Sequence, residues 1–214
     1  MVSIEAPLRE NLAAGILKLS GWQVGQPLLD PMCGSGTFLL EAAMVALDIA
    51  PGHKRSFGFE VLKNFESHVW QKLKSQASAK VKAVSFQKIY GSDVDLRAVR
   101  IAKKNLEEAG LLAAVQLSQV DIVNVIPPAD HGVLVANPPY GVRIGEGDDL
   151  ALLYPKLGEA LKRKFAGWNT YFLTNDLTMP KLMRLTPSKR TPLYNGPLEC
   201  RLFEIKMVAG SNRK

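Results

Sequence analysis

Apolar positions along the chain alternate between two spacings, and this alternation predicts an α/β fold. Short continuous apolar runs, typical of buried strands, are separated by segments whose apolar residues lie three or four positions apart, as in an amphipathic helix. Strands are expected at residues 27–30, 89–93, 115–120, 133–136 and 170–174, and helices at residues 7–20, 37–47, 96–109 and 150–165. Strands that alternate with helices indicate a parallel, doubly wound sheet.

Two segments depart from this alternation. Residues 49–88 separate the second helix from the second strand and contain several aromatic residues, and residues 60–82 are expected to be helical with lysines outward. A segment of about 40 residues is marginal for an independent core, so it is predicted to be an insertion in a single domain. Residues 190–208 read as a hairpin that turns at Tyr194-Asn195-Gly196-Pro197, which predicts an antiparallel edge of the sheet.

Composition and charge narrow the class of protein. The chain has 214 residues, of which 47% are hydrophobic, and it lacks an apolar run of the roughly 18 residues that a membrane span needs. Cys33 and Cys200 are the only cysteines, which fits the reducing cytoplasm and predicts neither a disulfide framework nor a zinc site. The net charge of +7 suggests a polyanionic partner such as nucleic acid, although solvated lysine faces would give the same count.

The segment from Asp30 to Thr37 carries the first candidate chemistry. It joins a strand to a helix, and its glycines, Gly34 and Gly36, would let the backbone approach a ligand at the helix N-terminus. The dinucleotide pattern Gly-x-Gly-x-x-Gly is not completed, because residue 39 is leucine. Asp30 would repel a pyrophosphate, so the loop favours a ligand with a cationic group, such as the ammonium of an amino acid.

Two further carboxylates follow the next two strands. Asp93 could accept hydrogen bonds from both hydroxyls of a ribose, and Asp121 could accept one from an adenine amino group. Each carboxylate alone is better explained as a helix cap than as a ligand contact. An ammonium site at Asp30, a ribose site at Asp93 and an adenine site at Asp121 together outline S-adenosylmethionine.

The fourth strand ends in Asn137-Pro138-Pro139-Tyr140. Two prolines cannot continue a strand ladder, so the backbone is stiff where open α/β sheets bind ligands. A plain strand-ending turn is the alternative explanation. An amide oxygen, a free carbonyl and an aromatic face suit a flat molecule that bears an amino group.

These motifs resemble those of a known family. The opening helix with Pro7, the loop Asp30 to Thr37, the segment Gly91-Ser92-Asp93, the motif Asn137 to Gly141 and the late Tyr194 to Leu198 are similar to the UPF0020 group, the catalytic domains of THUMP-containing RNA guanine-N2 methyltransferases. The resemblance implies a Rossmann-like class I methyltransferase, with a mostly parallel seven-stranded sheet, helices on both faces and an antiparallel C-terminal hairpin. Residues 1–214 would form one such domain, and the family's RNA-capturing THUMP region is expected to be absent, with Met1 added.

The resemblance also implies a cofactor, a partner and site residues. The cofactor would be S-adenosyl-L-methionine without a metal, and the partner would be RNA, specifically 23S ribosomal RNA or its precursor. Residues expected to contact the cofactor are Pro7, Asp30, Pro31, Cys33, Gly34, Ser35, Gly36, Thr37, Asp93, Val94, Asp121, Ile122 and Asn137.

Catalysis is expected to rest on Asn137, Pro138, Pro139 and Tyr140. The Asn137 oxygen and the Pro138 carbonyl would accept the two N–H bonds of the target amine, and Tyr140 would stack on an unpaired base. Cys33 is expected to be a packed small residue and not a nucleophile.

Several alternatives stay open. An Asn-Pro-Pro-Tyr site can hold the N6 amine of adenine in DNA, and a protein-glutamine methyltransferase would use the same motif. A catalytically silent RNA-binding module and a nucleotide-binding dehydrogenase are more distant options. The sequence does not determine the oligomeric state.

Overall fold

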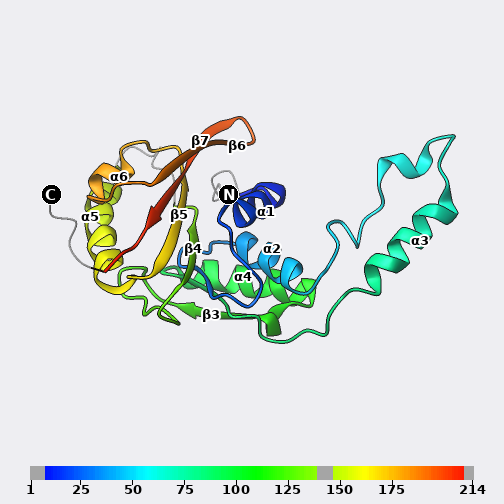
Figure 1. Cartoon of the computed structure of the whole chain (residues 1–214), viewed down its shortest axis with the longest axis horizontal. Helices are drawn as coiled ribbons and strands as arrows, with labels where there is room; N and C mark the ends of the chain where they lie inside the picture. The colour runs from blue at the N-terminus through cyan, green and yellow to red at the C-terminus, as the bar shows by residue number, and fades with distance from the viewer. Residues whose placement is uncertain (1–7, 139–146, 210–214) are drawn as a thin grey trace.

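The computed structural model describes residues 8–138 and 147–209, with only the backbone for residues 147–151. Seven strands form one sheet in the order β3-β2-β1-β4-β5-β7-β6 (Figure 1). The strands are β1 (Leu28–Asp30), β2 (Ile89–Asp93), β3 (Val115–Gln119), β4 (Gly132–Ala136), β5 (Trp168–Thr174), β6 (Lys189–Asn195) and β7 (Leu198–Lys206). Strands β1 to β5 pair in parallel and β7 pairs antiparallel with both β5 and β6, which confirms the predicted class I methyltransferase sheet.

Helices cover both faces of this sheet. Successive residues of a strand point to opposite faces, so the apolar runs of the central strands place apolar side chains on both faces. Leu28 and Val133 pack under α1 (Glu10–Leu19), α2 (Thr37–Ala46) and α4 (Leu96–Ala109), whereas Leu29 and Leu134 belong to a second core with α5 (Gly147–Lys164) and α6 (Met179–Leu182). Continuous apolar runs in the central strands are therefore explained by burial on both sides.

Helix α2 lies unusually close to the sheet at Gly91 in β2. A Cβ atom at this position would lie 2.3 Å from Leu39 Cδ1 and 2.9 Å from Leu117 Cδ2. A side chain at residue 91 would displace Leu39 and Leu117, so glycine at this position permits α2 to pack close against β2.

The insertion leaves the body as an extended arm (Figure 1). It contains a short 3-10 helix, η1 (Gly58–Val61), and one α-helix, α3 (Ser67–Ser78). The prediction of one helix over residues 60–82 is therefore wrong at both ends. The ring centroids of Phe59 and Trp70 lie 5.0 Å apart, whereas 11 residues of continuous helix would separate them by about 16 Å. The ring contact requires the chain to turn back, and a turn at Lys63 and Asn64 does so.

Other boundaries differ by a few residues from the expectations. Helix α1 begins at Glu10 instead of Pro7, β5 begins at Trp168, and α6 was not predicted. The hairpin is confirmed, with the turn narrowed to Gly196-Pro197 and a φ of 65° at Gly196. Across the described residues, no helix combines the length and apolar character needed to cross a membrane.

Candidate functional site

The loop between β1 and α2 is held tightly against two neighbouring elements. The Cys33 N–H donates to the Ser92 carbonyl of β2 at 2.9 Å, and the Gly36 N–H donates to the Cys33 carbonyl at 2.7 Å. Gly34 and Gly36 adopt φ values of 51° and 84°, in the left-handed region that favours glycine. A Cβ at Gly36 would lie 3.1 Å from the Ala102 Cβ of α4, so a side chain there would push the loop and α4 apart by a few tenths of an ångström.

Asn105 of α4 is a supporting residue that the sequence reasoning missed. Its side-chain Nδ2 donates to the Ser35 carbonyl at 2.9 Å, which ties the loop to a helix 70 positions away in the sequence. The Ser35 and Thr37 hydroxyls lie 3.3 Å apart at the start of α2. The sequence held no local signal for this contact, because a polar residue beside an apolar one is ordinary in an amphipathic helix.

Asp30, the last residue of β1, is a buried carboxylate. Only 2% of the residue is exposed, and its Oδ1 accepts a hydrogen bond from the Met32 N–H at 3.2 Å. The pKa of Asp30 is raised to about 8, chiefly by burial; the Met32 hydrogen bond lowers it and the nearby charge of Asp93 raises it, each by less than burial does. A cationic ligand beside this carboxylate would offset the desolvation and hold it ionised.

Asp93 ends β2 with both carboxylate oxygens engaged by the backbone. Oδ2 accepts from the Gly34 N–H at 3.0 Å, across 59 positions of sequence. Oδ1 accepts from the Asp95 N–H at 3.0 Å. Each oxygen of an ionised carboxylate has two lone pairs, so acceptor capacity remains for two further donors.

Asp121 follows β3 at the same edge of the sheet. Its Oδ1 accepts from the Val123 N–H at 3.1 Å, and the neighbouring Val120 N–H donates to the Asp93 carbonyl at 3.1 Å. Next to these carboxylates, Ile122 is buried whereas Val94 is 65% exposed. The structure thus brings Asp30, Asp93 and Asp121 to the carboxyl ends of three adjacent strands.

The helix-cap explanation for these carboxylates is wrong. Gly36 is the N-cap of α2, and Asp95 caps α4 by accepting from the Arg97 N–H. Asp30, Asp93 and Asp121 each sit beyond or at a strand end and accept from loop N–H groups instead.

The motif at the fourth strand is described in part. Strand β4 is buried throughout, and it leads directly to a half-buried Asn137 and a buried Pro138. Pro139, Tyr140 and Pro7 lie outside the described residues. Asn137 and Pro138 follow β4, which pairs with β1, so they stand at the same sheet edge as Asp30.

Cys33 is buried. Burial and the charges of Asp30 and Asp93 raise the pKa of its thiol, so the reactive thiolate is disfavoured. In the ranges that the structure describes, no three His, Cys, Asp or Glu side chains are grouped so that they could hold a metal ion.

Comparison with known proteins agrees with this architecture. The family model described as UPF0020, RMKL-like methyltransferase domain, matches residues 2–204. A Shewanella baltica protein named ribosomal RNA large subunit methyltransferase K/L is 44% identical over 98% of this chain and 30% of its own length. The chain thus spans about 30% of the length of this curated relative.

Two solved structures share the fold closely. SMU.472, a candidate methyltransferase complexed with SAH, is 36% identical with a TM-score of 0.88, over 97% of this chain and 55% of that one. A predicted N6-adenine-specific DNA methylase from Listeria monocytogenes is 31% identical with a TM-score of 0.85, over 97% and 53%. The chain belongs to the UPF0020 family of RMKL-like methyltransferase domains.

Proposed function

We propose that this chain transfers a methyl group from S-adenosyl-L-methionine to an exocyclic amine of an RNA base, the N2 amine of guanine in 23S ribosomal RNA. The observation that carries the proposal is the row of carboxylates at adjacent strand ends, beside an Asn-Pro motif at the fourth. A relative named for large-subunit ribosomal RNA methylation and a neighbour complexed with SAH support it.

In this proposal the row of carboxylates binds the methyl donor. Buried Asp30 would pair with the ammonium group of the methionine moiety, because a desolvated carboxylate gains most from a cationic partner. Asp93 would accept the two ribose hydroxyls with its remaining lone pairs. Asp121 would accept the adenine amino group, with buried Ile122 against the ring.

The target amine is a poor nucleophile, since its lone pair is delocalised into the base. The Asn137 side-chain oxygen and the Pro138 carbonyl would accept its two N–H bonds and direct the lone pair toward the methyl group. The nitrogen–carbon bond forms as the sulfur–carbon bond breaks in line, which yields S-adenosylhomocysteine. The methylated nitrogen then loses its extra proton to water, so no general base is needed. Tyr140 would stack on the base.

Methylation of adenine N6 in DNA is the second candidate, because the same pair of acceptors fits that amine. The similarity to a predicted N6-adenine-specific DNA methylase supports this second candidate. Nucleoside analysis after transfer of labelled methyl to RNA or to DNA separates the two. A cytoplasmic location is part of the main proposal and is supported by the relative named for ribosomal RNA methylation.

The decisive experiment is Asn137→Ala in the purified protein with ribosomal RNA as the substrate. We expect turnover to fall on the order of a hundredfold, because one preorganised acceptor is lost. Affinity for S-adenosylmethionine, measured by calorimetry, should be retained. Asn169→Ala is the matched control, since Asn169 is a half-buried asparagine near the start of β5. Unchanged turnover in Asn137→Ala would rule out its acceptor role.

A further inference from the structure

The positive charge of this protein is concentrated in residues 49–88, which we call the basic arm. It contains two glutamates and eight basic residues, so it carries a net charge of +6 out of +7 for the whole chain. The basic residues are Lys54, Arg55, Lys63, Lys72, Lys74, Lys80, Lys82 and Lys88. The body of the protein is therefore close to neutral, and a polyanion would be drawn to the arm.

Cations of the arm are paired less than those of the body. On α4, Lys103 and Lys104 lie 3.8 Å and 3.7 Å from glutamates one helical turn further on. In the arm, Glu60 accepts from the Phe57 N–H instead, and Glu66 lies 3.9 Å from His68.

Lys82 has an acidic partner, Asp48, at the base of the arm. Lys63, Lys72 and Lys80 are exposed, and no acidic partner is found for them among the described residues. Their charges are therefore available to a ligand.

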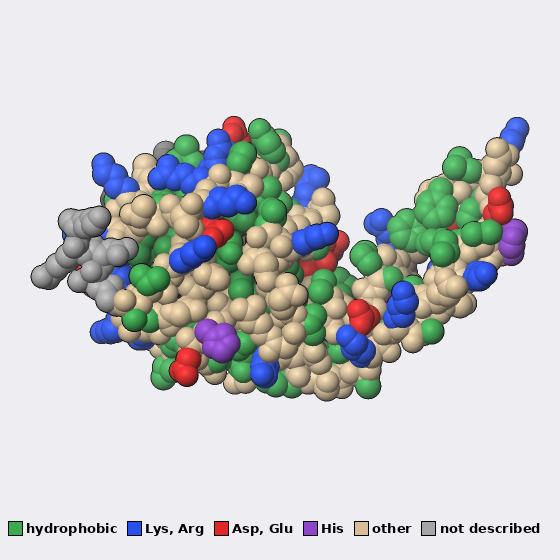
Figure 2. Space-filling model, viewed as in Figure 1, with side chains coloured by type: hydrophobic (Ala, Val, Ile, Leu, Met, Phe, Trp, Pro, Cys, Tyr) green, Lys and Arg blue, Asp and Glu red, His purple; other side chains and the backbone are tan. Residues whose placement is uncertain are grey.

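The arm has little core of its own. None of residues 48–88 is buried, and the arm is held together by an aromatic cluster of Phe57, Phe59, Phe65 and Trp70. Arg55 and Lys74 lie over two of these rings, at 4.7 Å and 5.5 Å from the centroids. The cluster is itself partly open to solvent, since Phe59 is 42% exposed, and the neighbouring Val61 and Leu62 are exposed as well. Figure 2 shows these hydrophobic side chains of the arm with Lys and Arg side chains around them.

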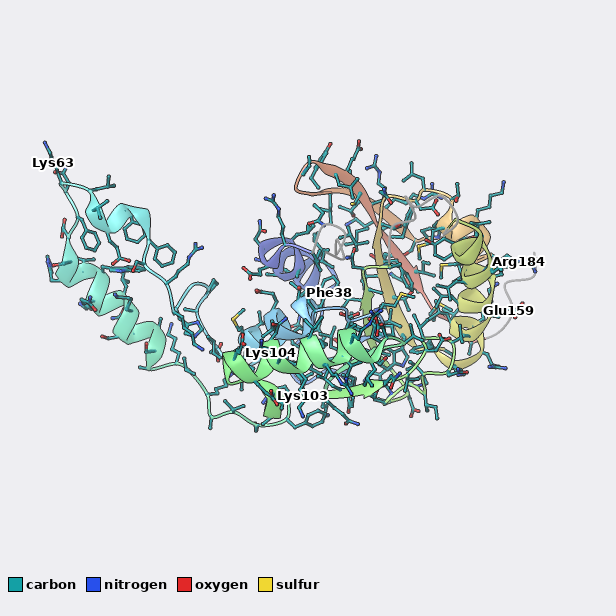
Figure 3. All side chains as sticks on the ribbon, turned by 180° about the vertical axis from the view of Figure 1, so that it is seen from behind. Phe38, Lys63, Lys103, Lys104, Glu159 and Arg184 are labelled. Atoms are coloured by element: carbon teal, nitrogen blue, oxygen red, sulfur yellow. The ribbon has the colours of Figure 1, made fainter. Side chains whose placement is uncertain are left out.

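The arm leaves the body at the amino ends of the strands, whereas the three carboxylates lie at the carboxyl ends. Helix α2 starts at the loop after β1 and runs for 10 residues before the arm begins, a length of about 15 Å. Figure 3 shows Lys63 at the far end of the arm, well away from Lys103 and Lys104 on α4. A ligand that touches both the arm and the catalytic edge must therefore be long.

We propose that the basic arm binds the phosphate backbone of RNA, as a second contact remote from the base that is methylated. This inference rests on the proposed function and specifies its substrate as a long RNA that reaches both contacts. The arm makes backbone contacts without reading sequence, so it raises affinity for RNA in general, and the catalytic edge selects the base.

The test compares two double variants with equal change of charge, Lys63→Gln/Lys72→Gln in the arm and Lys103→Gln/Lys104→Gln on the body. Binding of a fluorescein-labelled RNA hairpin of about 20 base pairs is followed by anisotropy over a range of salt concentrations. Each lost phosphate contact lowers the slope of log affinity against log salt by roughly 0.7 to 0.9. We expect the slope to fall by about 1.5 and affinity at low salt to fall roughly tenfold in the arm variant, with little change in the body variant.

Turnover separates this proposal from the proposed function. The arm variant should raise KM for ribosomal RNA and leave kcat unchanged, and transfer to a short oligonucleotide should not change. Binding to the hairpin is read without catalysis, so it tests the arm even if the methylated base is another one. Equal losses of RNA affinity in both double variants would overturn the proposal. Unchanged affinity in the arm variant would also overturn it and would leave the arm as a surface for a protein partner.

Discussion

Replacement of Asp30 with asparagine tests whether its burial controls both stability and ligand binding. Asparagine is close to isosteric and its Oδ1 can still accept from the Met32 N–H, which is 3.2 Å away in the native protein. The change removes the ionisable character of a residue that is 2% exposed, and it replaces one carboxyl oxygen by an NH2 group. Asp30→Asn therefore isolates the electrostatic contribution of this carboxyl group.

The magnitude follows from the pKa. Folding raises the pKa of Asp30 from 3.8 to about 8, so the folded protein binds this proton more tightly than the unfolded chain. Below about pH 3.8 the carboxyl group therefore does not lower the free energy of unfolding. As the pH rises from there toward 8 it lowers the free energy of unfolding progressively, and above pH 8 the loss stays constant. Between pH 5 and pH 7 the free energy of unfolding should fall by roughly 2 to 3 kcal/mol through this group.

The assay is urea unfolding without ligand at pH 5, 6 and 7. In Asp30→Asn the free energy of unfolding should not fall between pH 5 and pH 7, and this variant should be more stable than the native protein at pH 7. Asp121→Asn keeps Asp30, so its free energy of unfolding should fall as it does in the native protein. The same native pH dependence in Asp30→Asn would show that the pKa of Asp30 is not raised, and would refute the reasoning.

Ligand binding should respond in the opposite direction. To pair with an ammonium group, Asp30 must release its proton, so affinity for S-adenosylmethionine should rise about tenfold from pH 6 to pH 7. Above about pH 8 the amino group of the ligand itself deprotonates, which limits the range. Calorimetry at the two pH values measures this, and Asp30→Asn should bind weakly at both. A pH-independent affinity in the native protein would contradict the assigned ammonium partner.

Two further variants probe the loop and the ribose site. Asp93→Ala should weaken cofactor binding at least tenfold by calorimetry, because it removes the acceptor of the Gly34 N–H. Asp95→Ala, which removes only the cap of α4, should lower stability slightly and leave affinity unchanged. Gly36→Ala should lower the free energy of unfolding by roughly 1 to 2 kcal/mol in urea, since φ is 84° and Ala102 is 3.1 Å from the new Cβ. Gly58→Ala, where a Cβ meets nothing within 4 Å, is the control; equal losses in both would show that close approach at Gly36 is unimportant.

Local pattern was sufficient where a signal is contained within a few residues. The strand from Ile89 to Asp93 and the helix from Leu96 to Ala109 appear in the structure with the predicted bounds. The turn at Gly196-Pro197 needed only the local preference of glycine for positive φ. The insertion was predicted poorly, because contacts between Phe59 and Trp70, and not periodicity, decide where its helix begins.

The sequence by itself determined that acidic residues end three strands and that an Asn-Pro motif ends a fourth. A buried strand and the residues that end it can be recognised from the local order of apolar and polar residues. Only the tertiary structure decided what these residues can do. The high pKa of Asp30 comes from two packed cores that exclude water from the end of β1, and the Gly34–Asp93 hydrogen bond spans 59 positions. Separation of the basic arm from the body is likewise tertiary, because it depends on which surfaces fail to pack against each other.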